Sequence, residues 1–94
     1  MGNSIEAIST SNGTKYLNHG ELTDEAVLFS ECVRSTKWDF ESEGFGDLTI
    51  SFTDGTQYVY HNVSPLVFYS LLRANSPGGF FNRYIRDKYA YDRV

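Results

Sequence analysis

The sequence contains a single cysteine and no long apolar run. Cys32 cannot form an internal disulfide, so a reducing compartment is its natural setting. The longest apolar stretches, such as residues 66–69, are far shorter than the roughly 20 residues that cross a bilayer. The first residues lack the basic and apolar regions of a secretory signal. We therefore expect a cytoplasmic protein with no membrane partner.

Side chains that carry catalytic chemistry are also sparse. The two histidines, His19 and His61, have no neighbour at the spacing of common metal-binding motifs, so no metal and no cofactor is predicted. A lone cysteine with no histidine partner is more often a small core residue than a nucleophile. Glu41 and Glu43 lie in a glycine-flanked segment, which favours solvated charges over an acid and base pair. We expect a binding module rather than an enzyme.

Apolar and aromatic residues are plentiful, at 40 % and 16 % of the chain, which is enough for one core and too much for a disordered tail. A length of 94 residues allows one domain. The net charge of −4 is unevenly spread, because residues 1–55 sum to −7 and residues 56–94 to +3. Such a protein is poorly suited to a long polyanion, whereas a compact phosphate-bearing ligand fits its basic end. Two solvated halves without a ligand are the simpler alternative.

Alternating apolar and polar residues predict three central strands, at residues 33–38, 48–52 and 56–61. Residues 41–47 are polar and punctuated by glycine, which indicates a connection. Asn12-Gly13 is typical of a two-residue turn and predicts an N-terminal hairpin. Residues 22–29 fit a short helix or an extended segment, and both alternatives stay open.

Two helices are expected after the strands. Ser64-Pro65 and Ser76-Pro77 each combine a capping serine with proline at the first helical position, which predicts helices from 65 to about 75 and from 77 through 85. Residues 89–91 should be extended against the sheet. The fold class is therefore α+β, with a small antiparallel meander of about three core strands, plus the N-terminal hairpin, packed with two C-terminal helices.

The loop at Asp54-Gly55 decides which side of the sheet Tyr58 and Tyr60 face. A strict two-residue turn would separate them from the apolar residues of strand 48–52. A three-residue loop with Gly55 in a left-handed bulge pairs Ile50 with Tyr58 and gathers the large apolar side chains on one face. We predict this second register, with both tyrosines under the helices and their hydroxyls at the rim of the core. The opposite face then carries Thr49, Ser51, Gln57, Val59 and His61.

A candidate binding site begins at the second helix, whose N-terminus would present backbone N–H groups to an anion at Gly78 and Gly79. The side chains of Asn82, Arg83 and Arg86 follow within the next turns. Tight packing of the helix start explains the glycines equally well. A nucleotide site also needs a ring on which a base can stack. We assign that role to Tyr58, Tyr60 and Tyr89, and the further candidates are Trp38, Phe45 and Tyr91.

Two segments, "FTDGTQYVYHNVSP" and "LLRANSPGGFFNRYIRDKYAY", resemble the KTSC domain family. The family is named for its occurrence at the C-terminus of some lysyl-tRNA synthetases, and it also occurs as stand-alone proteins of bacteria and their phages. Its central Y-x-Y is matched by Tyr58 and Tyr60. Its F-N-x-x-I-R-x-x-Y run is matched by Phe81, Asn82, Ile85, Arg86 and Tyr89. One departure is Val63-Ser64-Pro65, where members usually have Val-Pro, so the connection is one residue longer.

The resemblance implies a KTSC-like domain at residues 30–94, with residues 1–29 as an N-terminal extension. It implies RNA binding only through the synthetase context, and a location in the bacterial cytosol or a phage-infected host. Two functions are carried forward. The first is non-enzymatic binding of RNA or a small phosphorylated nucleotide, with sequestration of a nucleotide signal as the form expected of a phage protein. The alternative is a protein-interaction or inhibitor module that uses the acidic N-terminal half. The oligomeric state stays open.

Overall fold

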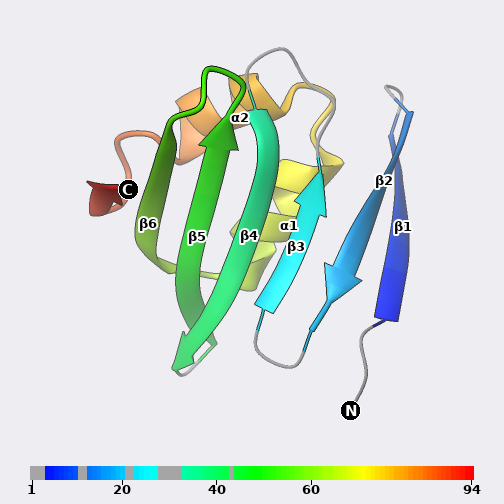
Figure 1. Ribbon diagram of the computed structural model, residues 1–94, viewed down its shortest axis with the longest axis horizontal. Helices are drawn as coiled ribbons and strands as arrows, with labels where there is room; N and C mark the ends of the chain where they lie inside the picture. The colour runs from blue at the N-terminus through cyan, green and yellow to red at the C-terminus, as the bar shows by residue number, and fades with distance from the viewer. Residues whose placement is uncertain (1–3, 11–12, 21–22, 28–32, 43) are drawn as a thin grey trace.

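The computed structural model describes residues 4–10, 13–20, 23–27, 33–42 and 44–94. Within these ranges the strands form one antiparallel sheet of seven, in which each strand lies beside its neighbours in sequence (Figure 1). The two helices lie on one face of this sheet, and the other face is open. The strands are β1 (Ser4–Thr10), β2 (Gly13–His19), β3 (Thr23–Val27), β4 (Val33–Ser42), β5 (Phe45–Phe52), β6 (Gln57–Val63) and β7 (Tyr91–Arg93), and the helices are α1 (Pro65–Arg73) and α2 (Pro77–Tyr84).

The fold is broadly α+β as predicted, but the prediction of about three core strands is wrong. Most of the stretch at 41–47 is strand rather than connection, because β4 and β5 continue past their apolar centres and pair Asp39 with Asp47 and Phe40 with Gly46. Acidic residues occur there because one face of the sheet is solvated. The chain also adds β3 at residues 23–27, so the described part of the segment 22–29 is extended, and β7 at the far edge.

The N-terminal hairpin is formed by β1 and β2, which pair over seven residues from Ser4 with His19 to Thr10 with Gly13. Its two-residue turn was predicted at Asn12-Gly13, but Gly13 is the first residue of β2 and pairs with Thr10. Residues 11 and 12 lie outside the described ranges, as do Cys32 and Glu43, for which predictions were made. In the residues that are described, no helix is long and apolar enough to cross a membrane.

The register between β5 and β6 is the one predicted from gathering the large apolar side chains on one face. Ile50 pairs with Tyr58 and Leu48 with Tyr60. The loop closes with the Phe52 N–H donating to the Thr56 carbonyl at 2.9 Å, while Gly55 has a φ of 94°. Only a residue that tolerates positive φ fits that position without strain. The bulged three-residue loop is therefore confirmed.

Both helices begin at the predicted serines. The Ser64 hydroxyl accepts from the Val67 N–H, and the Ser76 hydroxyl accepts from the Gly79 N–H. The helix α2 ends at Tyr84, so its apolar stripe is shorter than predicted. Phe81 of α2 and Ile85, the residue that follows the helix, are buried, whereas Tyr84 is exposed and its ring contacts that of Phe80.

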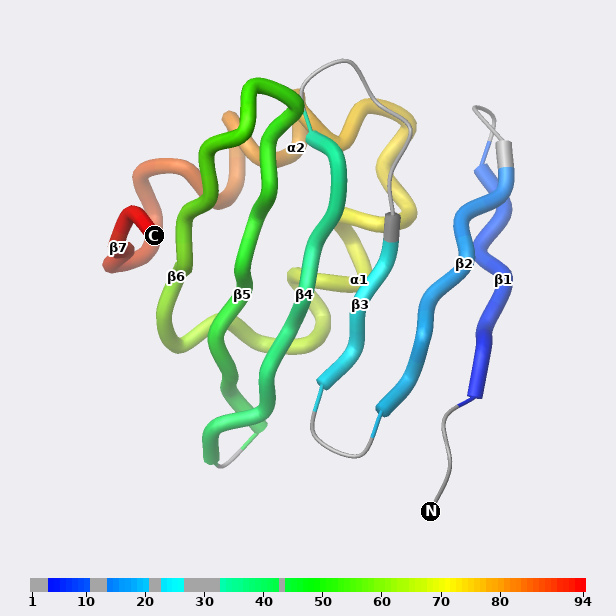
Figure 2. Tube along the Cα trace, viewed as in Figure 1, coloured from blue at the N-terminus to red at the C-terminus, as the bar shows by residue number. Residues whose placement is uncertain are grey.

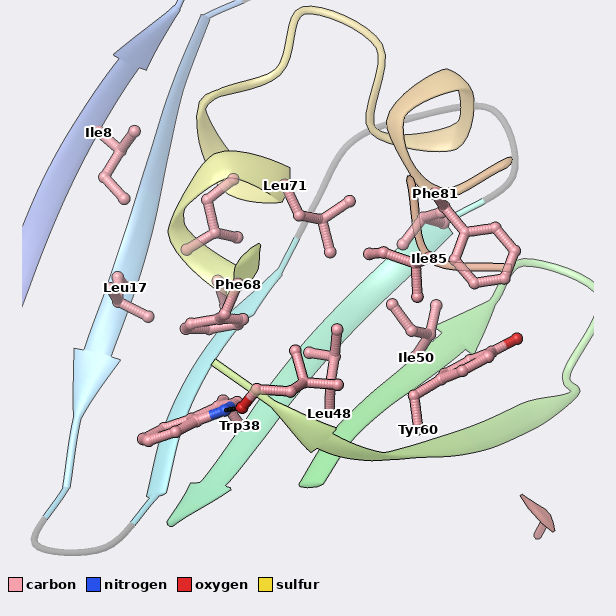
Figure 3. Close-up of a cluster of buried hydrophobic side chains, with 14 residues drawn as sticks. Ile8, Leu17, Trp38, Leu48, Ile50, Tyr60, Phe68, Leu71, Phe81 and Ile85 are labelled. Carbon is pink, nitrogen blue, oxygen red and sulfur yellow. Dashed lines mark hydrogen bonds between the residues drawn. The ribbon is translucent and has the colours of Figure 1, made fainter. Parts of the chain in front are cut away.

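One hydrophobic core lies between the sheet and the two helices (Figure 3). Phe68, Leu71 and Leu72 of α1 point into it and are fully buried. The N-terminal strands join the same core through Ile8, Leu17 and Ala26. Residues 1–29 and 30–94 therefore share one sheet and one core in their described parts, and the boundary between them stays a sequence prediction.

Trp38 of β4 forms a buried hydrogen bond to Val63, the last residue of β6. Its indole N–H donates to the Val63 carbonyl oxygen at 2.9 Å, across 25 residues of sequence (Figure 3). The Trp38→Phe variant keeps an aromatic ring but leaves that buried carbonyl without its donor. We expect the free energy of unfolding to fall by about 1 to 3 kcal/mol, the typical desolvation cost of such a group. Urea unfolding of the two proteins measures the difference, and an unchanged midpoint would contradict the contribution of this bond.

Candidate aromatic pocket

A pocket of about 460 Å³ lies between the β5–β6 hairpin, β7 and both ends of α2. This volume is within the range of pockets that hold small molecules. Because residues of β6, β7 and α2 line it, the pocket lies on the side of the sheet that carries the helices, near the edge farthest from β1. Its lining residues are Phe52, Asp54, Thr56, Tyr58, Tyr60, Gly78, Phe81, Asn82, Arg86, Asp87 and Tyr91.

Five aromatic rings form one connected wall of this pocket. The Tyr60 ring lies 5.5 Å from that of Phe81 and 5.4 Å from that of Tyr91, measured between centroids. The Tyr58 ring lies 6.0 Å from that of Phe52 and 5.7 Å from that of Tyr91. Tyr60 is only 3 % exposed and forms the floor, Tyr58 is half-buried, and Tyr91 is 54 % exposed. The wall can therefore receive a flat ring against Tyr91 and Tyr58.

Burial affects the acidity of Tyr60, the residue at the floor of the pocket. Desolvation raises the pKa of Tyr60 to about 12, with a further contribution from the neighbouring Tyr91. At neutral pH the Tyr60 phenol therefore keeps its proton and can donate a hydrogen bond.

The rim of the pocket is polar and nearly balanced in charge. Arg86 supplies a guanidinium, and Asp54 and Asp87 supply two carboxylates. The N–H and hydroxyl of Thr56 donate to Asp54 at 2.9 and 2.7 Å, and these bonds lower the pKa of its carboxyl, so it stays ionised. Arg93 adds a second guanidinium, 6.0 Å from the centre of the Tyr58 ring.

Five of the eight residues assigned to the site from sequence line this pocket, namely Tyr58, Tyr60, Gly78, Asn82 and Arg86. The other three, Gly79, Arg83 and Tyr89, do not. Arg83 is exposed on α2, and Tyr89 packs partly buried against the core. Arg86 lies beyond the end of the helix, where the chain turns back toward β7.

Ser76 caps part of the start of α2. Pro77 has no N–H group, the Gly79 N–H donates to the Ser76 hydroxyl, and the Phe80 N–H donates to the Ser76 carbonyl. A Cβ on Gly79 would lie 3.0 Å from the Ser76 hydroxyl oxygen. The Gly79 N–H is therefore occupied by the helix cap, and the side chains at the rim are the charged groups that could bind a phosphate.

Sequence reasoning missed part of the pocket. Tyr91 was only a stacking candidate, and four more of the missed residues come from the hairpin and the turn after α2, namely Phe52, Asp54, Thr56 and Asp87. The signal for Phe52 was present, because the bulged register puts it on the same face as Tyr58. Of the other stacking candidates, Trp38 is buried in the core and Phe45 is exposed at the far end of β5.

Both histidines are bridged by two carboxylates, which no sequence spacing indicated. His61 lies 3.1 Å from Asp47 and 2.8 Å from Asp92. The hydrogen bond to Asp92, which has the larger effect, and the one to Asp47 raise the pKa of His61 above the usual 6.5. His19 lies 2.9 Å from Glu6 and 3.1 Å from Asp24, and the Glu6 bond raises its pKa. In the described ranges, no group of three or more such side chains is arranged to hold a metal ion.

Comparison with known proteins identifies the family of this chain. A search of curated proteins found no match. The family model described as the KTSC domain matches residues 30–89, which include Tyr58, Tyr60, Phe81, Asn82 and Arg86. Two motifs that lie more than twenty residues apart in sequence thus meet in one pocket. The match covers more than half of the chain, and the protein belongs to the KTSC domain family.

Proposed function

We propose that the aromatic pocket binds one nucleotide unit, either free or at the end of a short RNA. The observation that carries this proposal is the connected wall of five rings with Arg86 and Asn82 at its rim. A base that stacks on such a wall gains roughly 1 to 3 kcal/mol per ring contact. Tyr91 and Tyr58 present the accessible ring surface, and the guanidinium of Arg86 binds the phosphate through charge-assisted hydrogen bonds.

The charge around the pocket favours a ligand with a single phosphate. Arg86 and Arg93 are balanced by Asp54 and Asp87. A triphosphate would bring several negative charges toward two carboxylates. The carboxylates instead suit donors such as ribose hydroxyls or an exocyclic amino group.

This function is binding without catalysis, in the cytosol of a bacterium or of a phage-infected host. Sequestration of a nucleotide signal is the role that such a site would serve in a phage protein.

Calorimetry at low salt tests the proposal with a series of probes. These are a nucleoside, its 5′-monophosphate, diphosphate and triphosphate, and a four-nucleotide RNA. We expect the monophosphate to bind more tightly than the nucleoside and at least as tightly as the triphosphate. The RNA arm distinguishes a terminal nucleotide from a free one. The absence of binding heat across the series would overturn the proposal.

A protein-interaction function is the second candidate, and one observation favours it. Among the described strands, β1 forms one edge of the sheet. Its residue Ile5 is 68 % exposed on the open face. Removing residues 1–29 would also remove Ile8 and Leu17 from the core, so a surface change is the better test. The Ile5→Lys variant should abolish partner capture in a pull-down while its melting temperature stays unchanged. If this variant still captures the partner, the proposed role of the β1 edge in protein binding is contradicted.

A further inference from the structure

We propose that His61 and Asp92 form a proton-dependent latch that keeps β7 on the sheet and Tyr91 in the pocket wall, so that ligand binding weakens as pH rises. Only the last clause rests on the proposed function, because the docking of β7 can be measured without ligand. The latch lies on the open face of the sheet, and the pocket lies on the face that carries the helices.

The strand β7 is short and attached at the edge of the sheet (Figure 2). It has three residues, all exposed. It pairs only with β6, and two backbone bonds bracket it, from the His61 N–H to the Ala90 carbonyl and from the Val94 N–H to the Gln57 carbonyl, both at 2.9 Å. A segment with so few contacts opens at low free energy, so one added side-chain bond changes its population measurably.

The alternation of side chains places the two functions of β7 on opposite faces. Tyr91 lies opposite Tyr60 and lines the pocket, whereas Asp92 lies opposite Val59 and reaches His61 on the open face. A bond on one side of the sheet therefore holds a ring on the other side. His61 is a positioning residue by this geometry, because it does not line the pocket.

A bulge in β6 aims the imidazole at this partner. Between the pairs made by Gly46 and Leu48, β6 carries an extra residue, and Asn62 takes a φ of 58° there. Asparagine tolerates this left-handed conformation better than most residues. Such bulges redirect the neighbouring side chain, here that of His61.

Both ring nitrogens of His61 face carboxylates, Nδ1 toward Asp47 of β5 and Nε2 toward Asp92 of β7. Both nitrogens can donate only when the imidazole is protonated. The next strand presents Asp39, which pairs with Asp47 in register and has the Lys37 amine 3.9 Å away. The charged groups that the structure places closest to this histidine are therefore acidic.

The direction of the pH effect follows from these bonds. Docking of β7 brings Asp92 to His61 and raises the pKa of the imidazole above 6.5. The contribution to docking is therefore complete below about pH 6.5 and is lost as pH rises through the raised pKa.

Amide hydrogen exchange tests the latch in the protein without ligand. We expect protection of the Val94 and His61 amides, corrected for intrinsic exchange, to fall about threefold between pH 5.5 and 8, as an exposed ion pair allows. The Asp92→Asn variant should lose this pH dependence. The His19→Gln variant is the matched control, because His19 is also bridged by two carboxylates but lies in β2, near the β1 edge of the sheet. This variant should keep the pH dependence.

Two further readouts complete the test. The ring protons of His61, followed by NMR, should titrate above pH 6.5 in the natural protein and lower in Asp92→Asn. With 5′-AMP and 5′-GMP as probes, affinity should fall about threefold more between pH 6 and 8 in the natural protein than in Asp92→Asn, a comparison that cancels titration of the phosphate. Equal protection and equal titration in the two proteins would overturn the latch. A latch seen without binding of either probe would sink the proposed function alone.

Discussion

Replacing Gly46 with alanine is expected to destabilise the protein by about 3 kcal/mol, near the upper end of the cost of overpacking a core. A Cβ at this position would lie 2.2 Å from the Asp39 carbonyl oxygen and 2.8 Å from Cε2 of Trp38. The indole crosses Gly46 to donate to Val63, the β6 residue that pairs with Gly46. The added methyl group must therefore displace either the β4 backbone or the buried hydrogen bond.

Thermal and urea unfolding measure this effect, and about 3 kcal/mol corresponds to a fall in melting temperature of roughly 12 to 24 °C for a domain of this size. The Gly79→Ala variant is the matched control. Its Cβ would meet only the Ser76 side chain, at 3.0 and 3.5 Å, and alanine has the higher helix propensity. We expect its stability to change by less than about 1 kcal/mol. Equal stability of the Gly46→Ala variant and the natural protein would contradict the close contact between β4 and β5.

The Arg86→Gln variant is expected to bind a nucleoside 5′-monophosphate about 10- to 100-fold more weakly than the natural protein. This range corresponds to the loss of one charge-assisted hydrogen bond to the phosphate. Binding of the corresponding nucleoside should be nearly unchanged, because stacking on Tyr91 and Tyr58 does not need the guanidinium. Calorimetry with both probes measures the two effects separately.

Arg83→Gln provides the matched control for this measurement. Arg83 was assigned to the same site from sequence, but it lies exposed on α2 and does not line the pocket. The Arg83→Gln variant removes one positive charge, as Arg86→Gln does, so both variants change the net charge equally. If the two variants weakened binding to the same extent, the phosphate would be held by the general charge of this end of the protein rather than by Arg86.

Local rules were enough to predict the centre of this fold. Burial selects one register for β5 and β6, because a slip of one residue would turn Tyr58 and Tyr60 to the other face. Serine followed by proline marks both helix starts, since each residue type satisfies or removes an N–H group there. These two results place five of the eight predicted residues around one pocket.

The remaining features depend on contacts that are distant in sequence. β4 and β5 were predicted too short because Asp39, Glu41 and Asp47 are acidic. These residues nevertheless belong to the two strands, which have one face exposed to solvent. Arg83 and Arg86 could not be separated without knowing that α2 ends at Tyr84. The bond from His61 to Asp92 joins residues 31 positions apart, and only the sheet order brings them together.

The central claim is that the aromatic pocket binds a nucleotide through stacking and a single phosphate contact. Intermolecular NOEs between an isotope-labelled protein and unlabelled 5′-AMP or 5′-GMP, at low salt, test it most directly. We expect contacts from base and ribose protons to the rings of Tyr58 and Tyr91, together with a shift of the Arg86 side-chain resonances. NOEs confined to the β1 edge, or no NOE and no shift at saturating nucleotide, would contradict it.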